Sequence, residues 1–457
     1  MKKVLIVAYH FPPVGGLGAA GAQRVLKFAR HLPSQQWQPH ILTVRELCYD
    51  SYLALDPALL DQVPKSLHIA RTGVLRGLRP VLRLKRRLRS LFRRPASRRN
   101  AAVRSAPNRG ENGDSSRYQK FKDAVTDLFQ IPDEVAGWLI PAVVSGARTV
   151  RREGIDVIFA TGRPWTALVI GTAIKAITGK PLVLDFRDPW MTNPFRLQYS
   201  AIKNRIEAIM ESRVIRSADA IIANTDCLRD EFVRRFGDTV KEKCVTIINS
   251  FDTEEFARIV PAARPRGQEK AFVLTHSGFL YGQRDPRTLL QAIRLLKDRN
   301  EIRDGEFLCN LVGSVELSYD LPEYLKEQGI AANVQLIGQV SYAESLAQLA
   351  ACDVALLLQP GTTTQIPSKL FEYIGLGHRI VTVAPANSAV VKLVMENGLG
   401  RVADPEDAEE IAAALKDAIR DWKTSAKDLA IRPEIQAKFE IRQCTARLAE
   451  QLDRLSA

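Results

Sequence analysis

The feature that most constrains this sequence is a regular alternation between short aliphatic, β-branched runs and longer stretches with apolar residues at helical spacing. Such an alternation is typical of parallel sheets that are covered by helices on both faces. It predicts strands at residues 3–9, 40–44, 156–161, 182–186, 220–224 and 245–249 in a first series, and at 272–277, 307–312, 334–337, 354–358, 380–383 and 400–403 in a second. The expected fold class is therefore α/β, with two doubly wound parallel-sheet domains.

A stretch rich in Pro, Gly and charge, residues 261–268, separates the two series and is typical of a linker. We accordingly expect a first domain at residues 1–258, a linker at 259–270 and a second domain at 271–430. Residues 431–457 carry apolar side chains at helical spacing and are predicted to form a C-terminal helix.

The net charge of the chain comes from one segment. The chain has 65 Lys and Arg against 51 Asp and Glu, and residues 71–109 hold 14 of the basic residues and no acidic one. Outside that segment the two signs balance. This distribution argues against a nucleic-acid-binding coat over the whole protein and favours a single contact with an anionic partner.

The basic residues belong to a predicted insertion at residues 71–117. Within residues 74–94, apolar side chains recur at three- and four-residue steps and basic ones mostly occupy other faces, which predicts a basic amphipathic helix. Such helices lie in the headgroup region of anionic membranes, so we expect membrane contacts from Arg83, Arg86, Arg87, Arg93 and Arg94. Two alternatives stay open: a solvated, partly disordered insert, and a nucleic-acid-binding patch. The lack of interleaved aromatic residues argues against the nucleic-acid patch.

Six cysteines stand far apart without a Cys-x-x-Cys pair, so neither a disulfide framework nor a metal site is expected. The sequence has no apolar run of about 18 residues that would span a membrane. The apolar start of the chain ends too early, at His10, for a secretory signal. We therefore expect a cytoplasmic protein, attached peripherally to the inner face of the plasma membrane.

The loop after the first predicted strand is rich in glycine. Gly16, Gly18 and Gly21 satisfy the Gly-x-Gly-x-x-Gly pattern, which keeps binding of NAD or FAD open as an alternative. In a dinucleotide fingerprint the first glycine follows the strand directly, whereas here Gly16 is the seventh residue after Tyr9. We expect Gly15 and Gly16 to let backbone amides approach a ligand at a helix start; the alternative is a turn that only caps this helix.

A second candidate site is the sequence Ile-Pro-Ser-Lys-Leu-Phe-Glu-Tyr at residues 366–373. Its Pro and Ser favour a helix start, so Ser368, Lys369 and Leu370 would lie at the positive end of a helix dipole, where a phosphate fits. Glu372 follows one turn later, and a carboxylate can accept both hydroxyls of a ribose. Arg284 could add a second cation to the same diphosphate. The alternative is a surface lysine and glutamate on an ordinary amphipathic helix.

Five motifs follow one another in order: Phe-Pro-Pro-x-Gly-Gly at residues 11–16, Asp-Phe-Arg-Asp-Pro-Trp at 185–190, Asn-Ser-Phe-Asp at 249–252, Gly-Phe-Leu-Tyr-Gly-Gln-Arg-Asp-Pro at 278–286 and Pro-Ser-Lys-Leu-Phe-Glu-Tyr at 367–373. In this combination the chain resembles the family 4-like glycosyltransferases of the GT-B fold over nearly its whole length. The resemblance implies two Rossmann-like domains that face a central cleft, with the acceptor on the first, the nucleotide-sugar donor on the second, and a C-terminal helix that returns to the first. It also implies transfer without a metal, usually with retention of the anomeric configuration.

The resemblance assigns roles in the second domain. Arg284 and Lys369 match the diphosphate-binding cations of the family, and Glu372 matches its ribose-binding glutamate. Two positions depart from the pattern. Thr364 stands where many members have a glutamate near the transferred sugar, and Ser250 replaces the glycine of an Asn-Gly-x-Asp turn.

In the first domain, the glycines at residues 15–16 match the family's loop that closes over the donor. We expect Asp188 to orient the acceptor hydroxyl or the donor sugar, and Arg187 to contact a phosphate or the acceptor. The alternative is structural: Asp185 would pair with Arg187, and Trp190 would be a packing residue rather than a platform for a sugar.

The favoured function is a glycosyltransferase that moves a hexosyl or related sugar from a UDP- or GDP-linked donor, without a further cofactor, to a glycan or lipid-linked acceptor of the cell envelope or a surface polysaccharide. Anionic membrane is an expected partner, and nucleic acid is not. An NAD- or FAD-dependent oxidoreductase and a catalytically inactive GT-B scaffold remain the alternatives.

Overall fold

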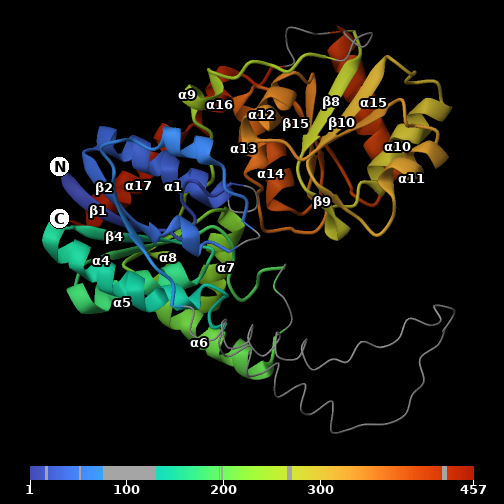
Figure 1. Cartoon of the computed structure of the whole chain (residues 1–457). Helices are drawn as coiled ribbons and strands as arrows, with labels where there is room; N and C mark the ends of the chain where they lie inside the picture. The colour runs from blue at the N-terminus through green and yellow to red at the C-terminus, as the bar shows by residue number, and fades with distance from the viewer. Residues whose placement is uncertain are drawn as a thin grey trace, which may run out of the picture.

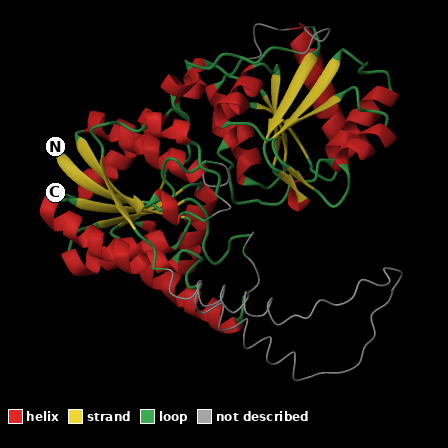
Figure 2. Cartoon of the chain, viewed as in Figure 1, coloured by secondary structure: helices red, strands yellow, loops and turns green. Residues whose placement is uncertain are grey.

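The computed structural model describes residues 1–15, 19–50, 53–75, 130–194, 196, 199–264, 270–424 and 430–456. They form two α/β lobes, each with a parallel sheet between layers of helices (Figures 1 and 2). We call the lobe that contains the N-terminal strands the first lobe and the other the second lobe. The predicted fold class is confirmed.

The first lobe is built on a seven-stranded sheet in the order β3-β2-β1-β4-β5-β6-β7, and all neighbouring strands are parallel. The strands are β1 (Lys2–Val7), β2 (Trp37–Val44), β3 (His68–Thr72), β4 (Val157–Gly162), β5 (Leu182–Phe186), β6 (Ala220–Ala223) and β7 (Cys244–Thr246). The strand order reverses between β1 and β4. In such sheets, ligands bind beyond the carboxyl ends of the strands at that reversal.

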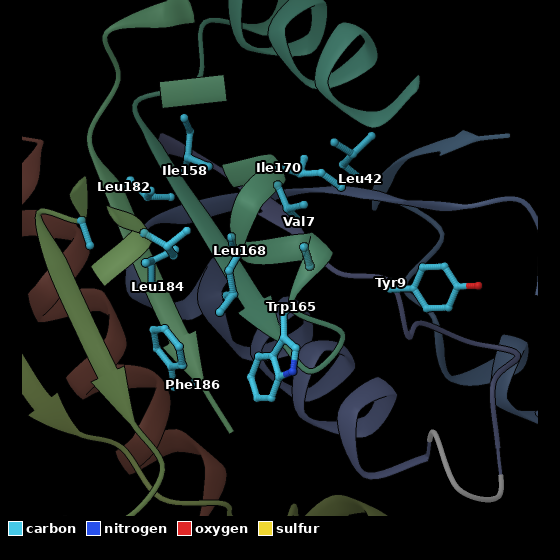
Figure 3. Packing of buried hydrophobic residues seen from close by; sticks show 14 of the residues in the cluster. Val7, Tyr9, Leu42, Ile158, Trp165, Leu168, Ile170, Leu182, Leu184 and Phe186 are labelled. Atoms are coloured by element: carbon cyan, nitrogen blue, oxygen red, sulfur yellow. The ribbon is translucent and has the colours of Figure 1, made fainter. Parts of the chain in front are cut away.

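Helices cover both faces of this sheet because its central strands are apolar on both sides. Along β1, Val4 and Ile6 pack on one face, whereas Leu5 and Val7 pack on the other. Figure 3 shows the second of these layers, in which Leu168 lies among side chains of the strands. The helices of the lobe are α1 (Ala19–His31), α4 (Leu139–Glu153), α5 (Thr166–Thr178), α6 (Ala201–Ser217), α7 (Asp226–Phe236) and α8 (Asp238–Lys241), with short 3-10 turns at Leu32–Gln35, Glu46–Cys48, Pro57–Gln62 and Ala136–Trp138.

Strand β3 was not predicted, and it corrects the start of the insertion. The strand lies at the edge of the sheet and is only partly buried, so its sequence lacks an aliphatic run. Arg71, which we expected in the insertion, belongs to β3 instead. Its guanidinium donates a 2.8 Å hydrogen bond to the carbonyl of Pro12. Residues 76–117, with Arg83, Arg86, Arg87, Arg93 and Arg94, lie outside the described residues.

The second lobe is built on a six-stranded parallel sheet in the order β12-β10-β8-β13-β14-β15. Its strands are β8 (Phe272–Ser277), β10 (Phe307–Val312), β12 (Val334–Gly338), β13 (Val354–Leu358), β14 (Ile380–Val383) and β15 (Gly400–Ala403). Five of these six have the predicted limits. A two-stranded pair that was not predicted, β9 (Leu280–Tyr281) and β11 (Val315–Glu316), lies beside it. The helices are α10 (Arg287–Asp298), α11 (Leu321–Glu327), α12 (Tyr342–Ala350), α13 (Lys369–Gly375), α14 (Ala389–Glu396) and α15 (Ala408–Thr424).

The chain crosses between the lobes twice. The first crossing leads from β7 through α9 (Thr253–Phe256) to β8, and the second leads from α16 (Pro433–Ala437) to α17 (Ile441–Leu455). The crossings are joined, because the amide of Phe251 donates to Phe439 at 3.2 Å and the amide of Ile441 donates to Phe251 at 2.8 Å. Helix α17 then packs on the first lobe beside α1 (Figure 1).

Candidate active site

The two lobes touch through loops at the carboxyl ends of their strands. Gln365, after β13, donates a 2.6 Å hydrogen bond from its side-chain amide to the carboxylate of Asp188, after β5. Next to this contact, the hydroxyl of Thr225 donates to the carbonyl of Thr364 at 3.0 Å. The loop that leads into the motif at residues 366–373 is therefore brought to the motif at residues 185–190.

Two cations of the second lobe lie at this edge. Lys369 begins α13, and its ammonium group donates to the carbonyl of Ser277 at the end of β8. Arg284 donates to the side chain of Gln359 at 2.8 Å. Burial lowers the pKa of Lys369 to about 8, opposed by the charge of Glu372 and aided by that of Arg284. Lys369 and Arg284 are thus close enough to act on one anion.

The β8 loop leaves room for the lysine because it has a glycine there. A Cβ atom on Gly278 would lie 2.8 Å from Nζ of Lys369 and 2.7 Å from Nε2 of His276. His276 is buried, and its Nδ1 faces the carbonyl of Leu356 at 3.0 Å. Because a carbonyl only accepts, Nδ1 carries the proton and Nε2 is an acceptor, which has no hydrogen-bond partner among the described residues. Burial and the charge of Lys369 lower the pKa of His276 to about 3.

Glu372 lies one turn into α13, beside the cations. Its side chain is half-buried, and burial raises its pKa, while the charges of Lys369 and Lys27 favour its ionised form. No hydrogen bond to its carboxylate occurs within the described part of the chain. The carboxylate is therefore unused by the fold.

The other two predicted positions of this motif are placed differently. Ser368 precedes the first residue of α13, and its hydroxyl makes no capping hydrogen bond. The side chain of Leu370 is fully buried in the core, and its amide donates to the carbonyl of Pro367 at 3.2 Å. The side chain of Leu370 consequently packs the helix onto the sheet and does not face the site.

The glycine loop of the first lobe differs from our expectation. The amide of Gly15 donates a 2.8 Å hydrogen bond to the carbonyl of Ala54, so the fold already uses it and it is not free for a ligand. Gly16 lies outside the described residues. Strand β1 ends at Val7 and α1 begins at Ala19, so the first glycine of the Gly-x-Gly-x-x-Gly pattern does not follow the strand as a dinucleotide fingerprint requires.

Arg187 is held against the first lobe. Its guanidinium donates to the carbonyl of Gly162 at 3.2 Å and to that of Arg163, and burial lowers its pKa. A Cβ atom on Gly21 would lie only 1.8 Å from Nη1 of Arg187, so this glycine of α1 makes room for the guanidinium. Burial raises the pKa of Asp188, which the charges of Arg187 and Arg163 and the hydrogen bond from Gln365 counteract.

Asp185 and Trp190 have structural partners. Asp185 is fully buried and forms a 2.8 Å ion pair with Arg24, and Thr161 donates to it at 2.7 Å. It does not pair with Arg187. Trp190 is also fully buried and stacks on Trp165, with 5.4 Å between the rings, so it is a packing residue.

Three residues at this edge were not singled out from the sequence: Gln365, Thr225 and Arg163. Arg163 is exposed. Its charge and that of Arg187 add to the effect of burial on His10, and together they lower the pKa of His10 to about 3. The only sequence signal was the position of Gln365 directly before the predicted motif at residues 366–373.

The described ranges lack two further features. They contain no group of three or more His, Cys, Asp or Glu side chains placed to hold a metal ion. Nor does any helix among them combine the length and the apolar character needed to cross a bilayer.

Comparison with known proteins gives two family matches. Residues 117–249 match the glycosyl transferase 4-like domain, and residues 262–430 match the glycosyl transferases group 1. No curated protein sequence matches the chain.

Several solved structures share the architecture. Anabaena Alr3699/HepE in complex with UDP is 17% identical, with a TM-score of 0.60 and coverage of 100% of both chains. A glycosyltransferase from Rickettsia africae is 12% identical, with a TM-score of 0.61 and coverage of 99% of this chain and 98% of that one. Sucrose-phosphate synthase from Thermosynechococcus elongatus is 13% identical, with a TM-score of 0.60 and coverage of 100% and 99%.

Two parallel-sheet lobes, joined by a double crossing and meeting at the carboxyl ends of their strands, define the GT-B fold. The two family matches make the assignment more specific. Residues 117–249 carry a glycosyl transferase 4-like domain and residues 262–430 a group 1 domain, so the chain is a glycosyltransferase and the predicted resemblance is confirmed.

Proposed function

We propose that the enzyme transfers a sugar from a nucleotide-linked donor, bound by residues 271–430, to an acceptor bound by residues 1–258, in the synthesis of the cell envelope or a surface polysaccharide. The observation that carries this proposal is the placement of Lys369 and Arg284 together at the carboxyl edge of the second sheet. The UDP complex of HepE, which has the same fold, supports a UDP-linked donor, and GDP remains the alternative.

In this proposal the leaving diphosphate is stabilised by protein cations. As the bond between sugar and diphosphate breaks, negative charge grows on the diphosphate, and the ammonium of Lys369 and the guanidinium of Arg284 offset that charge. Glu372 accepts hydrogen bonds from the ribose diol. Because two cations supply the charge stabilisation, transfer proceeds without a resident metal, and we propose retention of configuration as in related enzymes.

The first lobe presents the acceptor. Asp188 orients the attacking hydroxyl or the donor sugar, and Gln365 fixes its carboxylate from the second lobe. Arg187 lies beside Asp188 and contacts an anionic group of the donor or the acceptor. Neither residue acts as a nucleophile in this scheme.

We further propose peripheral attachment to the inner face of the plasma membrane, where a lipid-linked acceptor is located. The basic residues of segment 74–94 motivate this part of the proposal. Replacement of Arg86, Arg87, Arg93 and Arg94 with Gln should reduce liposome binding while hydrolysis of the donor continues. Unchanged liposome binding would refute the role of the segment.

A thermal-shift panel with UDP, GDP, ADP and NAD tests the donor site. One nucleoside diphosphate should raise the melting temperature, and Lys369→Ala and Glu372→Ala should each abolish that shift. The matched control is Lys392→Ala, which removes an exposed lysine of α14 that pairs only loosely, at 3.8 Å, with Glu396. A shift with NAD alone would instead favour an oxidoreductase, and a shift without sugar transfer to any acceptor would favour an inactive scaffold.

A further inference from the structure

Helices α4, α5 and α6 form a layer over one face of the first sheet, and they lie side by side in Figure 1. The outer surface of this layer is unusually apolar. Large aliphatic side chains, between 44% and 63% exposed, occur on all three helices: Ile140, Val144, Ile177, Ile202 and Ile209. Large aliphatic side chains exposed on three neighbouring helices point to a surface that contacts something less polar than water.

The charges on this layer have one sign. Its exposed arginines are Arg148, Arg151 and Arg152 on α4 and Arg205, Arg213 and Arg216 on α6. The three helices contain only three acidic residues. Glu207 and Glu211 are buried and paired with arginines, and Glu153 pairs with Arg152. The surface is therefore cationic as well as apolar.

A groove of about 630 Å³ lies between α4 and the edge strand β3. Its lining combines guanidinium and hydroxyl groups, which are good ligands for phosphate oxygens: Ala70, Ser145, Arg148, Thr149, Arg151 and Arg152. Within the described part of the chain, Arg148 and Arg151 have no ion-pair partner. The groove thus holds two cations that the fold does not use.

The opposite face of the same sheet has a different surface. Helix α17, which covers it, exposes no large aliphatic side chain and alternates acidic residues with basic ones, such as Glu450 with Arg447 and Asp453 with Arg454. Mixed charge of this kind is typical of a surface that faces only water. The combination on α4, α5 and α6 is therefore a local property of one side of the first lobe.

We infer that the α4–α5–α6 surface docks onto an anionic lipid bilayer, with a phosphate headgroup in the groove beside β3. The arginines attract the negative surface, and the isoleucines enter the headgroup region, where apolar side chains leave water. The inference rests on the proposed membrane attachment and gives that attachment a folded surface, separate from segment 74–94.

The test is sedimentation of the full chain with vesicles of phosphatidylcholine, with and without phosphatidylglycerol. Arg148→Gln, Arg151→Gln and Arg152→Gln together should weaken binding to the anionic vesicles on the order of 100-fold, because each basic residue near such a surface contributes about fivefold. Ile140→Ser, Val144→Ser and Ile209→Ser together should also weaken it. The matched control removes three exposed charges on α17 or just before it: Lys438→Gln, Arg447→Gln and Arg454→Gln.

The outcomes separate this inference from the proposals on which it rests. All variants should keep the thermal shift with the preferred nucleoside diphosphate, since none of these residues is among those proposed to bind the donor. Absence of that shift in the unmodified chain would refute the donor site instead. Vesicle binding that depends on the arginines of segment 74–94 but not on α4 would overturn the inference alone. So would a dimer in lipid-free solution that the isoleucine variant dissociates, because the surface would then bind a second copy.

Discussion

The side-chain amide of Gln365 donates a 2.6 Å hydrogen bond to the carboxylate of Asp188 and joins the second lobe to the first. Burial raises the pKa of Asp188, and this hydrogen bond acts in the opposite direction. Gln365→Leu should therefore raise that pKa further. If ionised Asp188 is required, the acidic limb of the pH profile for sugar transfer moves to higher pH.

Thr225→Val is the matched control for Gln365→Leu. It removes the neighbouring hydrogen bond between the lobes, to the carbonyl of Thr364, without touching Asp188. Its pH profile should keep the position of the native enzyme. Coincident profiles for Gln365→Leu and the native enzyme would contradict the role given to Asp188.

Lys369 predicts a pH dependence of diphosphate binding. Its pKa is lowered to about 8, so the ammonium loses its proton as the pH rises through that value, and the attraction for UDP is lost with it. The dissociation constant of UDP, measured by calorimetry on both sides of pH 8, should rise by up to about tenfold per pH unit above the pKa. Lys369→Arg stays charged throughout this range and should flatten the profile; a native profile that is already flat would argue against contact with the diphosphate.

Gly21 should be intolerant of a side chain. Alanine normally stabilises a helix relative to glycine by about 1 kcal/mol, but a Cβ atom here would lie 1.8 Å from Arg187 and displace its guanidinium. Gly21→Ala should lower the rate of sugar transfer while the affinity for UDP stays unchanged. Gly73→Ala is the control, because none of the described residues lies within 4 Å of a Cβ atom there. Equal rates of sugar transfer for both variants would mean that Arg187 has no role in the transfer step.

Removal of one partner from the buried pair of Arg24 and Asp185 should strongly destabilise the first lobe. Both side chains are almost completely buried, so Arg24→Met leaves an unpaired buried carboxylate and should cost about 3–5 kcal/mol of unfolding free energy. Arg299→Met breaks an exposed pair with Glu409 and should cost about 0–1 kcal/mol. Urea unfolding followed by tryptophan fluorescence reports on the first lobe, which contains four of the five tryptophans: Trp37, Trp138, Trp165 and Trp190. A similar loss in both variants would mean that the buried pair has no special role.

The sequence predicted those strands whose burial is visible in their own residues. Strand β13 is buried on both faces and is an uninterrupted aliphatic run, so its limits were predicted. Strand β3 is half-exposed at a sheet edge, and its residues carry no such pattern. The domain limits at residues 258, 270 and 430 stay a prediction.

Some features of the candidate site could likewise be predicted from the sequence, and others could not. Lys369 and Glu372 could be singled out because one short motif contains both a helix start and the next turn. The contact of Gln365 with Asp188 joins residues 177 positions apart and exists only through the packing of the lobes. The amide of Gly15 could not be assigned correctly either, since its partner, Ala54, lies on a loop without a recognisable pattern.

The backbone of Phe251 is hydrogen-bonded to Phe439 through its amide and to Ile441 through its carbonyl, so the two linkers between the lobes are joined to each other. Two linkers that are joined in this way act as a hinge. They allow the lobes to rotate relative to each other about one axis and resist twisting or sliding. Opening of the lobes to admit a donor and closure around it would then follow a single path. Cleavage of the chain after residue 430 would leave the lobes connected by the first linker alone.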